Sequence, residues 1–278
     1  MRFTKMQGLG NDYVYVNLFE EKVDDPARRA REISDRHFGV GADGLILIEP
    51  SKVVDVGMRI FNADGSEAQM CGNGIRCLAK YAYEHWLCEK EEMIVATMAG
   101  ARTVRLIMED GVVTGATVNM GPPRLRRSEI PMLGHDDGRV VDEVLTVGDK
   151  MVKVTCVSMG NPHCIVPVGS LEGRAWRALG PQIENQESFP ERTNVHFVEV
   201  VSRQEVRVAT WERGSGATLA CGTGAAAVCV AMHLLGRTER SIVAHLPGGD
   251  LKLEWSEGDD CVYMTGPAVE VFTGEWPE

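Results

Sequence analysis

The chain repeats itself at a fixed spacing of 150 residues, and this repeat restricts its fold more than any other feature. The motif Cys71-Gly72-Asn73-Gly74 aligns with Cys221-Gly222-Thr223-Gly224 (221 − 71 = 150). Three further segments keep the same spacing without a gap, namely 10–11 with 160–161, 44–49 with 194–199 and 61–62 with 211–212. Turn residues alone rarely stay in register over such a length, so the repeat indicates an internal duplication. We therefore expect two similar domains related by a pseudo-twofold axis.

The length and composition of the chain agree with two domains. It has 278 residues, more than a single hydrophobic core normally organises. Hydrophobic residues make up 44%, which is ordinary for a globular protein with sizeable cores. The proline-rich segment Gly121-Pro122-Pro123 lies between the repeated parts and is typical of a domain boundary.

Strand patterns dominate both halves. Apolar, β-branched runs between turn residues predict strands at 12–18, 44–49, 56–62, 93–98, 101–119, 151–158, 163–168, 194–200, 205–212, 241–246, 250–255 and 261–265. Pro26 is expected to begin a charged helix that runs to about His37. Helices are also predicted after the two Cys-Gly motifs, at 72–86 and 223–235, and the second is apolar on nearly every side, as buried helices are. We therefore expect an α+β fold in which each domain is a curled, strand-rich sheet wrapped around a central helix.

The charge distribution argues against several classes of partner. The formal net charge is −11, and no block of basic residues is present, so we expect neither nucleic-acid binding nor an anionic-membrane surface. The longest apolar stretch, Ala225 to Leu235, is too short to span a bilayer. No apolar signal-peptide core follows Met1. A cytoplasmic protein with a small-molecule substrate is the expectation.

The chain has eight cysteines, and the pattern favours reduced thiols over disulfides. A long chain without a secretion signal normally keeps its cysteines reduced. No Cys-x-x-Cys pair occurs, so neither a structural zinc site nor any other metal site is expected. Six of the cysteines lack the Gly-flanked setting of the repeated motif and are assigned to packing: Cys77, Cys88, Cys156, Cys164, Cys229 and Cys261.

The two remaining cysteines, Cys71 and Cys221, are predicted to lie at the start of a helix. The first turn of a helix has unpaired N–H groups and partial positive charge, which lowers a thiol pKa and binds carboxylates. Two such helix starts pointing at one another would place one sulfur on each face of a carbon beside a bound carboxylate. One cysteine could then remove a proton while the other returns one, which inverts a stereocentre. A lone cysteine is more often a small buried apolar residue, but the duplicated setting favours catalysis.

Segment 62–76 (NADGSEAQMCGNGIR) resembles the signature of diaminopimelate epimerases. Further matching motifs cover essentially the whole chain: GLGND at 8–12, SMGNPHC at 158–164, PERTN at 190–194, WERG at 211–214, ACGTG at 220–224, LPGG at 246–249 and MTGP at 264–267. The resemblance implies conversion of LL-2,6-diaminopimelate to the meso form without pyridoxal phosphate, metal or another cofactor, in lysine and peptidoglycan precursor synthesis. It also implies an active site in the cleft between two domains, 1–120 plus 266–278 and 121–265, and a homodimer.

The resemblance assigns a role to each matching residue. Cys71 and Cys221 would be the two acid/base residues, and His163 and Glu212 would tune thiol protonation. Substrate binding would fall to Asn11, Asn62, Gly72, Asn73, Asn161, Asn194, Glu212, Arg213, Gly222 and Thr223. Arg213 suits a carboxylate, and asparagines can bind both carboxylate and ammonium groups. Out of this context, the asparagines and His163 would be read as turn formers, and Glu212 as a surface ion-pair partner.

Two positions depart from the family pattern. Gly44 stands where some members carry a glutamine that binds substrate, so this contact must be absent or supplied otherwise. Ala217 stands where many carry glutamate, although related variants also have alanine there.

Three other functions remain open. A proline or hydroxyproline racemase uses a similar cysteine pair, but the expected asparagines and arginine favour a substrate with two charged ends. A thiol redox protein could cycle Cys71 and Cys221 between dithiol and disulfide, although Cys-x-x-Cys is missing. A catalytically silent amino-acid-binding module would have lost a sulfur, and both are present.

Overall fold

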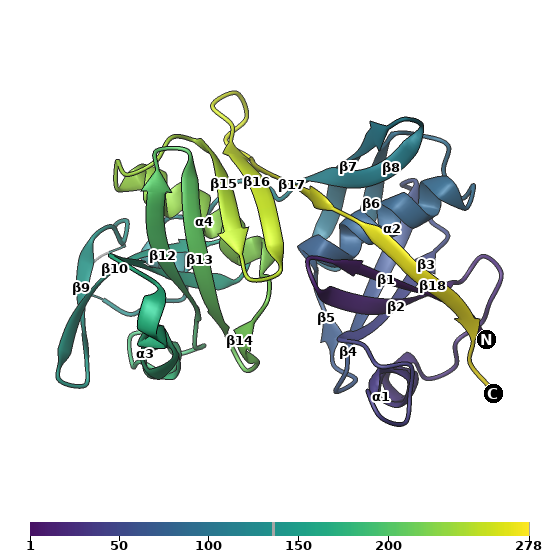
Figure 1. Cartoon of the computed structure of the whole chain (residues 1–278), viewed down its shortest axis with the longest axis horizontal. Helices are drawn as coiled ribbons and strands as arrows, with labels where there is room; N and C mark the ends of the chain where they lie inside the picture. Colours follow the sequence, from purple (N-terminus) through teal and green to yellow (C-terminus); the bar gives the residue numbers. More distant parts are fainter. Residues whose placement is uncertain (135–136, 278) are drawn as a thin grey trace. The chain divides into compact units, whose positions relative to one another are not determined.

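The computed structural model describes residues 1–134 and 137–277, which form two compact units. The first unit comprises Met1–Asn119 and Thr265–Glu278, and the second comprises Met120–Met264. Residues 135, 136 and 278 of the expected domains lie outside the described residues. The C-terminal strand thus belongs to the first unit, where it pairs with the N-terminal strand (Figure 1).

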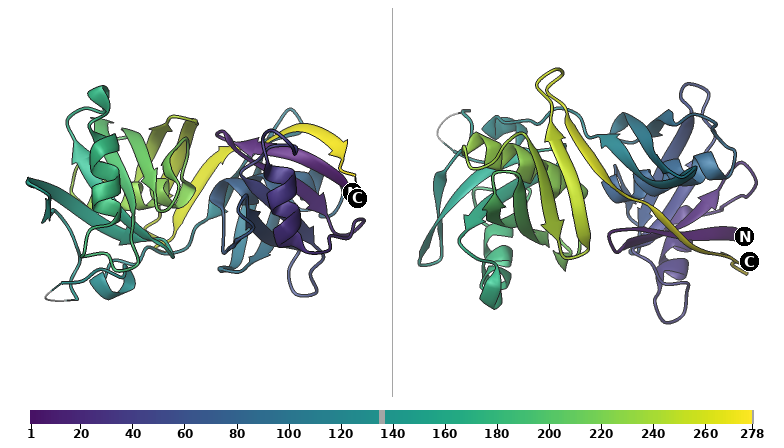
Figure 2. Two further views of the ribbon diagram at one scale, coloured as in Figure 1. Left: turned by 90° about the horizontal axis from the view of Figure 1, so that it is seen from below. Right: turned by 45° about the horizontal axis from the view of Figure 1, so that its top comes forward.

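The first unit is a mixed sheet curled around one helix. Its strands pair in the order β18 (Val269–Glu275), β1 (Arg2–Gly8), β2 (Asn11–Asn17), β3 (Gly44–Glu49), β4 (Val56–Asn62), β6 (Glu92–Thr97), β7 (Gly100–Glu109), β8 (Val112–Asn119) and β17 (Val262–Pro267). A short strand, β5 (Glu67–Ala68), pairs with β4. Helix α2 (Gly72–Glu84) contacts β1, β2, β4, β6, β7, β8 and β18, so the sheet wraps around it (Figure 2). Helix α1 (Pro26–Ser34) packs on β3 and β4.

The second unit repeats this plan. Its strands pair in the order β9 (Glu143–Val147), β10 (Lys150–Ser158), β11 (Pro162–Val168), β12 (Asn194–Ser202), β13 (Glu205–Glu212), β15 (Ser241–Leu246) and β16 (Gly249–Trp255), and β14 (Gly216–Thr218) pairs with β13. Helix α4 (Gly222–Leu234) contacts β10, β11, β12, β15 and β16. Helix α3 (Trp176–Glu184) packs on β12 and β13, and two 3₁₀ turns lie at Arg127–Glu129 and Glu172–Arg174.

Strand registers reproduce the 150-residue spacing of the sequence. Tyr13 pairs with Gly44 between parallel strands in the first unit, and His163 pairs with Asn194 in the second (163 − 13 = 150; 194 − 44 = 150). Helices α2 and α4 also begin and end 150 residues apart (222 − 72; 234 − 84). The predicted α+β fold with two pseudo-symmetric domains is therefore confirmed.

Some predicted elements were wrong or missing. The single strand predicted at 101–119 is a hairpin, β7 and β8, because Asp110 and Gly111 have φ values of 51° and 79° and form a tight turn. The helix from Pro26 ends at Ser34 instead of about His37, since Asp35 leaves the helical conformation. Most other predicted strands lie within two residues of the observed bounds.

Among the described residues, six strands and helices were not predicted at all: β1, β9, β18, β5, β14 and α3. The first three lack a long apolar run; β1 and β18 pair with each other from opposite ends of the chain, whereas β9 forms a local hairpin with β10. Helix α3 contains Gly180 and Pro181, which argue against a helix. Gly180 is needed there because a Cβ would lie 2.7 Å from the Trp211 ring.

The cysteines are all free thiols. Five of the six assigned to packing are buried, but Cys261 is partly exposed, so its assignment was wrong. In the part of the chain that the structure describes, no helix is both long and apolar enough to cross a membrane.

Candidate active site

Cys71 and Cys221 are the N-cap residues of α2 and α4, each with an extended backbone. The Cys71 Sγ accepts a hydrogen bond from the Gly74 N–H at 3.3 Å. The Cys221 Sγ lies 3.7 Å from the Thr223 Oγ1. Both sulfurs therefore lie at the first turn of a helix, where the N–H groups have no acceptor within the helix and attract an anion.

The pKa of Cys71 differs from the expectation. Burial raises the pKa of this thiol, and hydrogen bonds from the backbone N–H groups of Gly74 and Asn73 offset the increase only in part. The predicted lowering of the pKa was therefore wrong for Cys71, because desolvation of a thiolate outweighs the field of the helix. In keeping with a protonated thiol, the Cys71 Sγ donates to the Asn11 Oδ1 at 3.3 Å.

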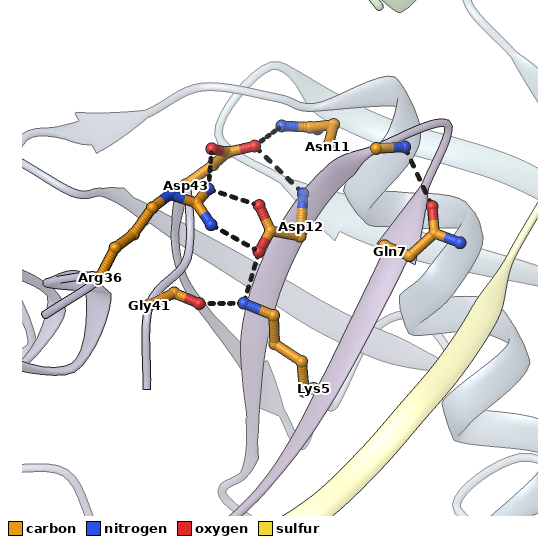
Figure 3. Close-up of polar contacts among 8 residues, drawn as sticks. Lys5, Gln7, Asn11, Asp12, Arg36, Gly41 and Asp43 are labelled. Carbon is orange, nitrogen blue, oxygen red and sulfur yellow. Dashed lines mark hydrogen bonds and ion pairs between the residues drawn. The ribbon is translucent and has the colours of Figure 1, made fainter. Parts of the chain in front are cut away.

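Asn11 is oriented by a network of charged groups (Figure 3). The Asn11 Nδ2 donates to the Asp43 Oδ2 at 2.7 Å, and the Asp12 backbone N–H donates to the same oxygen at 3.1 Å. The Arg36 guanidinium bridges the carboxylates of Asp12 and Asp43 at 2.8 and 2.9 Å. Because its Nδ2 is engaged, Asn11 presents its Oδ1 to Cys71.

Lys5 completes this network from strand β1. Its buried ammonium lies 2.5 Å from the Asp12 carboxylate and also donates to the Gly41 carbonyl. Although burial acts to raise it, the pKa of Asp12 is lowered by hydrogen bonds from Arg36 and Lys5. Lys5, Arg36 and Asp43 lay outside the sequence prediction because no motif marked them, and Asp12, although part of the GLGND motif, was given no role.

Asn73 and the fully buried Arg76 connect the start of α2 to strand β17. The Asn73 Nδ2 donates to the Asn11 Oδ1 at 3.4 Å, and its Oδ1 accepts from the Arg76 Nη2 at 3.0 Å. Arg76 also donates to the Gly72 carbonyl at 3.2 Å and to the Pro267 carbonyl at 3.1 Å. The structure thus brings Asn11, Asn73 and Cys71 together in the first unit.

In the second unit, Asn161 and His163 lie in one hydrogen-bonded chain. The Asn161 Nδ2 faces the Thr223 Oγ1 at 3.4 Å, and its Oδ1 faces the His163 Nε2 at 2.9 Å. The His163 Nδ1 lies 2.9 Å from the His196 Nε2, and the His196 Nδ1 lies 3.0 Å from the Thr210 Oγ1. Sequence reasoning missed His196 and Thr210.

Both histidines are neutral. Burial lowers the pKa of His163 well below its ordinary value, and electrostatic interactions with His196 and Arg213 act in the same direction. Burial alone lowers the pKa of His196 to about 3. Desolvation has this effect because it penalises the charged form of a base.

The other expected substrate-binding side chains have partners within their own unit. The Asn194 Oδ1 accepts from the Arg213 backbone N–H at 3.0 Å, and its Nδ2 donates to the Pro162 carbonyl at 2.9 Å. The Glu212 Oε1 accepts from the Thr218 hydroxyl at 2.6 Å. The Asn62 Nδ2 donates to the Ser66 Oγ at 3.0 Å. Gly72 and Gly222 are buried in the first helical turns.

Gly44 has no room for a side chain. A Cβ at this position would collide with the Phe61 carbonyl and would lie 2.8 Å from the Tyr13 ring and 3.1 Å from the Asn62 Cα. The side chain that some relatives place here is therefore excluded by the local packing. Tyr13 fills part of this space. Burial raises the pKa of Cys71, and a hydrogen bond with the Tyr13 side chain opposes part of that rise.

Among residues 1–134 and 137–277, no group of three or more His, Cys, Asp or Glu side chains is arranged to bind a metal ion. The metal-free and cofactor-free site suggested by the sequence stays a prediction.

Comparison with known proteins places this arrangement in context. A family model described as diaminopimelate epimerase matches residues 3–126 and 155–271. A diaminopimelate epimerase of Moorella thermoacetica is 53% identical over 100% of this chain and 99% of its own length. One from Agathobacter rectalis is 52% identical and covers 99% of each chain.

Solved structures with low sequence identity share the fold. A probable proline racemase from Agrobacterium radiobacter K84 superposes with a TM-score of 0.71 at 16% identity, covering 99% of this chain and 92% of its own. A hydroxyproline epimerase from Agrobacterium vitis gives a TM-score of 0.70 at 18% identity, covering 99% and 91%. At such identities the likeness concerns the fold alone.

Proposed function

The chain belongs to the diaminopimelate epimerase family and is an isomerase, and we propose that it interconverts LL-2,6-diaminopimelate and meso-2,6-diaminopimelate. The observation that carries the proposal is the matched placement of Cys71 and Cys221, each the N-cap of the central helix of its unit, 150 residues apart. A reversible inversion at carbon needs two acid/base groups of similar strength, and duplicated cysteines meet this need.

In the proposed reaction, one cysteine is a thiolate and the other a thiol, on opposite faces of the α-carbon. The thiolate removes the α-hydrogen as a proton, and the electron pair of the C–H bond delocalises toward the carboxylate. The thiol then donates its proton to the other face, so the configuration inverts. No atom is oxidised or reduced, and the two sulfurs have exchanged protonation states.

The helix starts supply the electrostatic part of catalysis. Backbone N–H groups of Gly72, Asn73, Gly222 and Thr223 belong to the first turns and would bind the reacting carboxylate. They would stabilise the negative charge that grows on this group as the proton leaves.

The remaining predicted residues would recognise the substrate. Asn11 and Asn161, which carry hydrogen bonds to residues of the first helical turns, would contact it beside the reacting carbon. Arg213, with support from Asn62, Asn194 and Glu212, would bind the distal amino-acid end. The distal end needs such contacts because it keeps its configuration while the other end inverts.

The proposal includes several expectations beyond the reaction. The reaction would serve lysine and peptidoglycan precursor synthesis, use no cofactor and occur in the cytoplasm. The chain would act as a homodimer.

A deuterium-exchange experiment tests the proposed function. Reduced protein is incubated with LL-diaminopimelate in D2O, and NMR follows the α-proton signals, with proline as a parallel substrate. Deuterium incorporation with appearance of the meso isomer is expected. Exchange in proline alone would retain the two-thiol chemistry but reject the substrate, and no exchange in either would reject the epimerase and favour the redox or binding functions.

A further inference from the structure

A buried chain of hydrogen bonds extends from the interior of the second unit to the start of α4. It joins Thr210, His196, His163, Asn161 and Thr223 through successive contacts of 3.0, 2.9, 2.9 and 3.4 Å. Thr210, His196 and His163 are at most 1% exposed. Neither the sequence motifs nor the proposed function gives His196 a role.

The Asn161 carboxamide oxygen sets the direction of the hydrogen bonds through the two histidines. The Asn161 Oδ1 can only accept, so the His163 Nε2 must carry a proton. In a neutral imidazole the His163 Nδ1 is then an acceptor, and it requires a proton on the His196 Nε2. The His196 Nδ1 in turn accepts from the Thr210 hydroxyl. Donors and acceptors match throughout with both rings neutral, whereas an imidazolium at His163 would require His196 to change to the Nδ1-protonated tautomer and donate to Thr210.

We propose that His196 is a positioning residue, which fixes His163 as the Nε2-protonated neutral tautomer and thereby makes His163 a hydrogen-bond donor to Asn161. In this tautomer the His163 Nε2 has no lone pair, so it cannot accept a proton from a thiol there. His163 instead keeps the Asn161 carboxamide in one orientation, with its NH2 group toward Thr223. The expectation that His163 tunes thiol protonation stays a prediction, and the proposal adds this orienting role.

The surroundings of the pair favour neutral rings. The His196 ring packs on the first turn of α4, where a Cβ on Gly224 would lie 2.8 Å from its Nδ1 and collide with its Cε1. The positive end of the helix disfavours a cation at this place. Arg213 is the charged group that acts on His163, and its positive charge has the same effect.

The first unit uses a different device at the equivalent positions. His163, His196 and Thr210 correspond to Tyr13, Ile46 and Ile60 (163 − 13 = 196 − 46 = 210 − 60 = 150). There, the carboxamide of Asn11 is oriented through its Nδ2 by Asp43. Ile46 and Ile60 are fully buried in that fold, so isoleucine is a natural replacement to test in the second unit.

The inference rests on the proposed function only for its kinetic consequences, and NMR tests it independently of activity. Long-range 1H–15N correlation on 15N-labelled protein distinguishes the two neutral tautomers and the imidazolium of each histidine. We expect Nε2-protonated neutral rings for both His163 and His196 between pH 6 and 8, with signals assigned from His163→Gln and His196→Gln spectra. An Nδ1-protonated or charged His163 in this range would overturn the proposal.

Two replacements of His196 separate positioning from packing. His196→Gln retains an N–H donor near the place of the ring Nε2, whereas His196→Ile removes it. We expect His196→Ile to lower kcat/KM about tenfold, mainly through KM, as for a lost orienting hydrogen bond. We also expect it to release the His163 tautomer and to introduce an ionisation near pH 6 to 7 into the profile of kcat/KM.

The conservative variants complete the test. His196→Gln should keep the wild-type tautomer of His163 and the wild-type pH profile, and Thr210→Val should perturb both in the direction of His196→Ile. The partly exposed His245, which pairs with Asp250, provides a His245→Gln control that changes neither. Equal loss in His196→Gln and His196→Ile, or an unchanged His163 tautomer in His196→Ile, would overturn the proposal. If no variant and no wild-type sample epimerises, the proposed function fails while the tautomer measurement still decides the inference.

Discussion

Acidification should destabilise this protein through the two buried histidines of the second unit. His163 and His196 are both fully buried, and the pKa of each is lowered, that of His196 to about 3. In the unfolded chain each would titrate at about 6.5. The unfolded state therefore binds more protons below this pH, and the free energy of unfolding falls as the pH falls. The contribution is fully present above pH 6.5 and continues to be lost down to the pKa values of the folded state.

The magnitude follows from the linkage relation. Consider a histidine that titrates at about 6.5 in the unfolded chain and stays neutral in the folded protein. Between pH 8 and pH 5, each such histidine lowers the free energy of unfolding by about 2 kcal/mol. His196 alone should therefore remove about 2 kcal/mol, and His163, whose pKa is also lowered, adds to this loss, which is a large part of the roughly 5–15 kcal/mol typical of a folded protein.

The assay compares urea unfolding, followed by tryptophan fluorescence, in wild type and His196→Ile from pH 8 to pH 5. The variant should be less stable at pH 8, because His163 and Thr210 lose a hydrogen-bond partner. Its stability should nevertheless fall by at least about 2 kcal/mol less on acidification, since one neutral histidine is gone and the pKa of the released His163 moves toward its unfolded value. Contributions from the carboxylates cancel in this difference. Equal losses in wild type and variant would refute the reasoning, and His245→Gln serves as the control at a partly exposed histidine.

Three further predictions concern the cysteines, Asn11 and Gly44. Replacing Cys71 or Cys221 with alanine should lower kcat for diaminopimelate inversion by at least about 10³-fold, because one face of the α-carbon loses its acid or base. Near-wild-type turnover would reject the two-thiol mechanism. Asp43→Ala should lower kcat/KM about tenfold, because the Asn11 carboxamide loses the carboxylate that orients it. The matched exchange Asp24→Ala, at an exposed position, should leave kcat/KM unchanged. Gly44→Ala should destabilise the fold by about 1–3 kcal/mol in urea unfolding, because the added Cβ collides with the Phe61 carbonyl. An unchanged urea midpoint would show that the strand relaxes freely.

The repeat made the architecture predictable from the sequence. A shared 150-residue spacing implies the same strand registers twice, and the pairs Tyr13–Gly44 and His163–Asn194 have them. The helix starts were also readable, because Cys-Gly-x-Gly before an apolar run is a local signal. The hairpin at Asp110-Gly111 and the hairpin of β9 with β10 were missed although their turns are local, whereas β1 and β18 pair with each other from opposite ends of the chain.

What only the tertiary structure decided is the state and orientation of the groups at each helix start. The sequence by itself determined that Cys71 and Cys221 cap equivalent helices and that asparagines accompany them. It did not determine that burial raises the pKa of Cys71, since burial depends on how the sheet closes around α2. Nor did it determine which end of each asparagine is engaged: Asp43 binds the Nδ2 of Asn11, whereas His163 donates to the Oδ1 of Asn161. Asn11 and Asp43 are 32 positions apart, and His163 contacts both Asn161 and, on the neighbouring strand, His196, so neither arrangement has a signature in the order of residues along the chain.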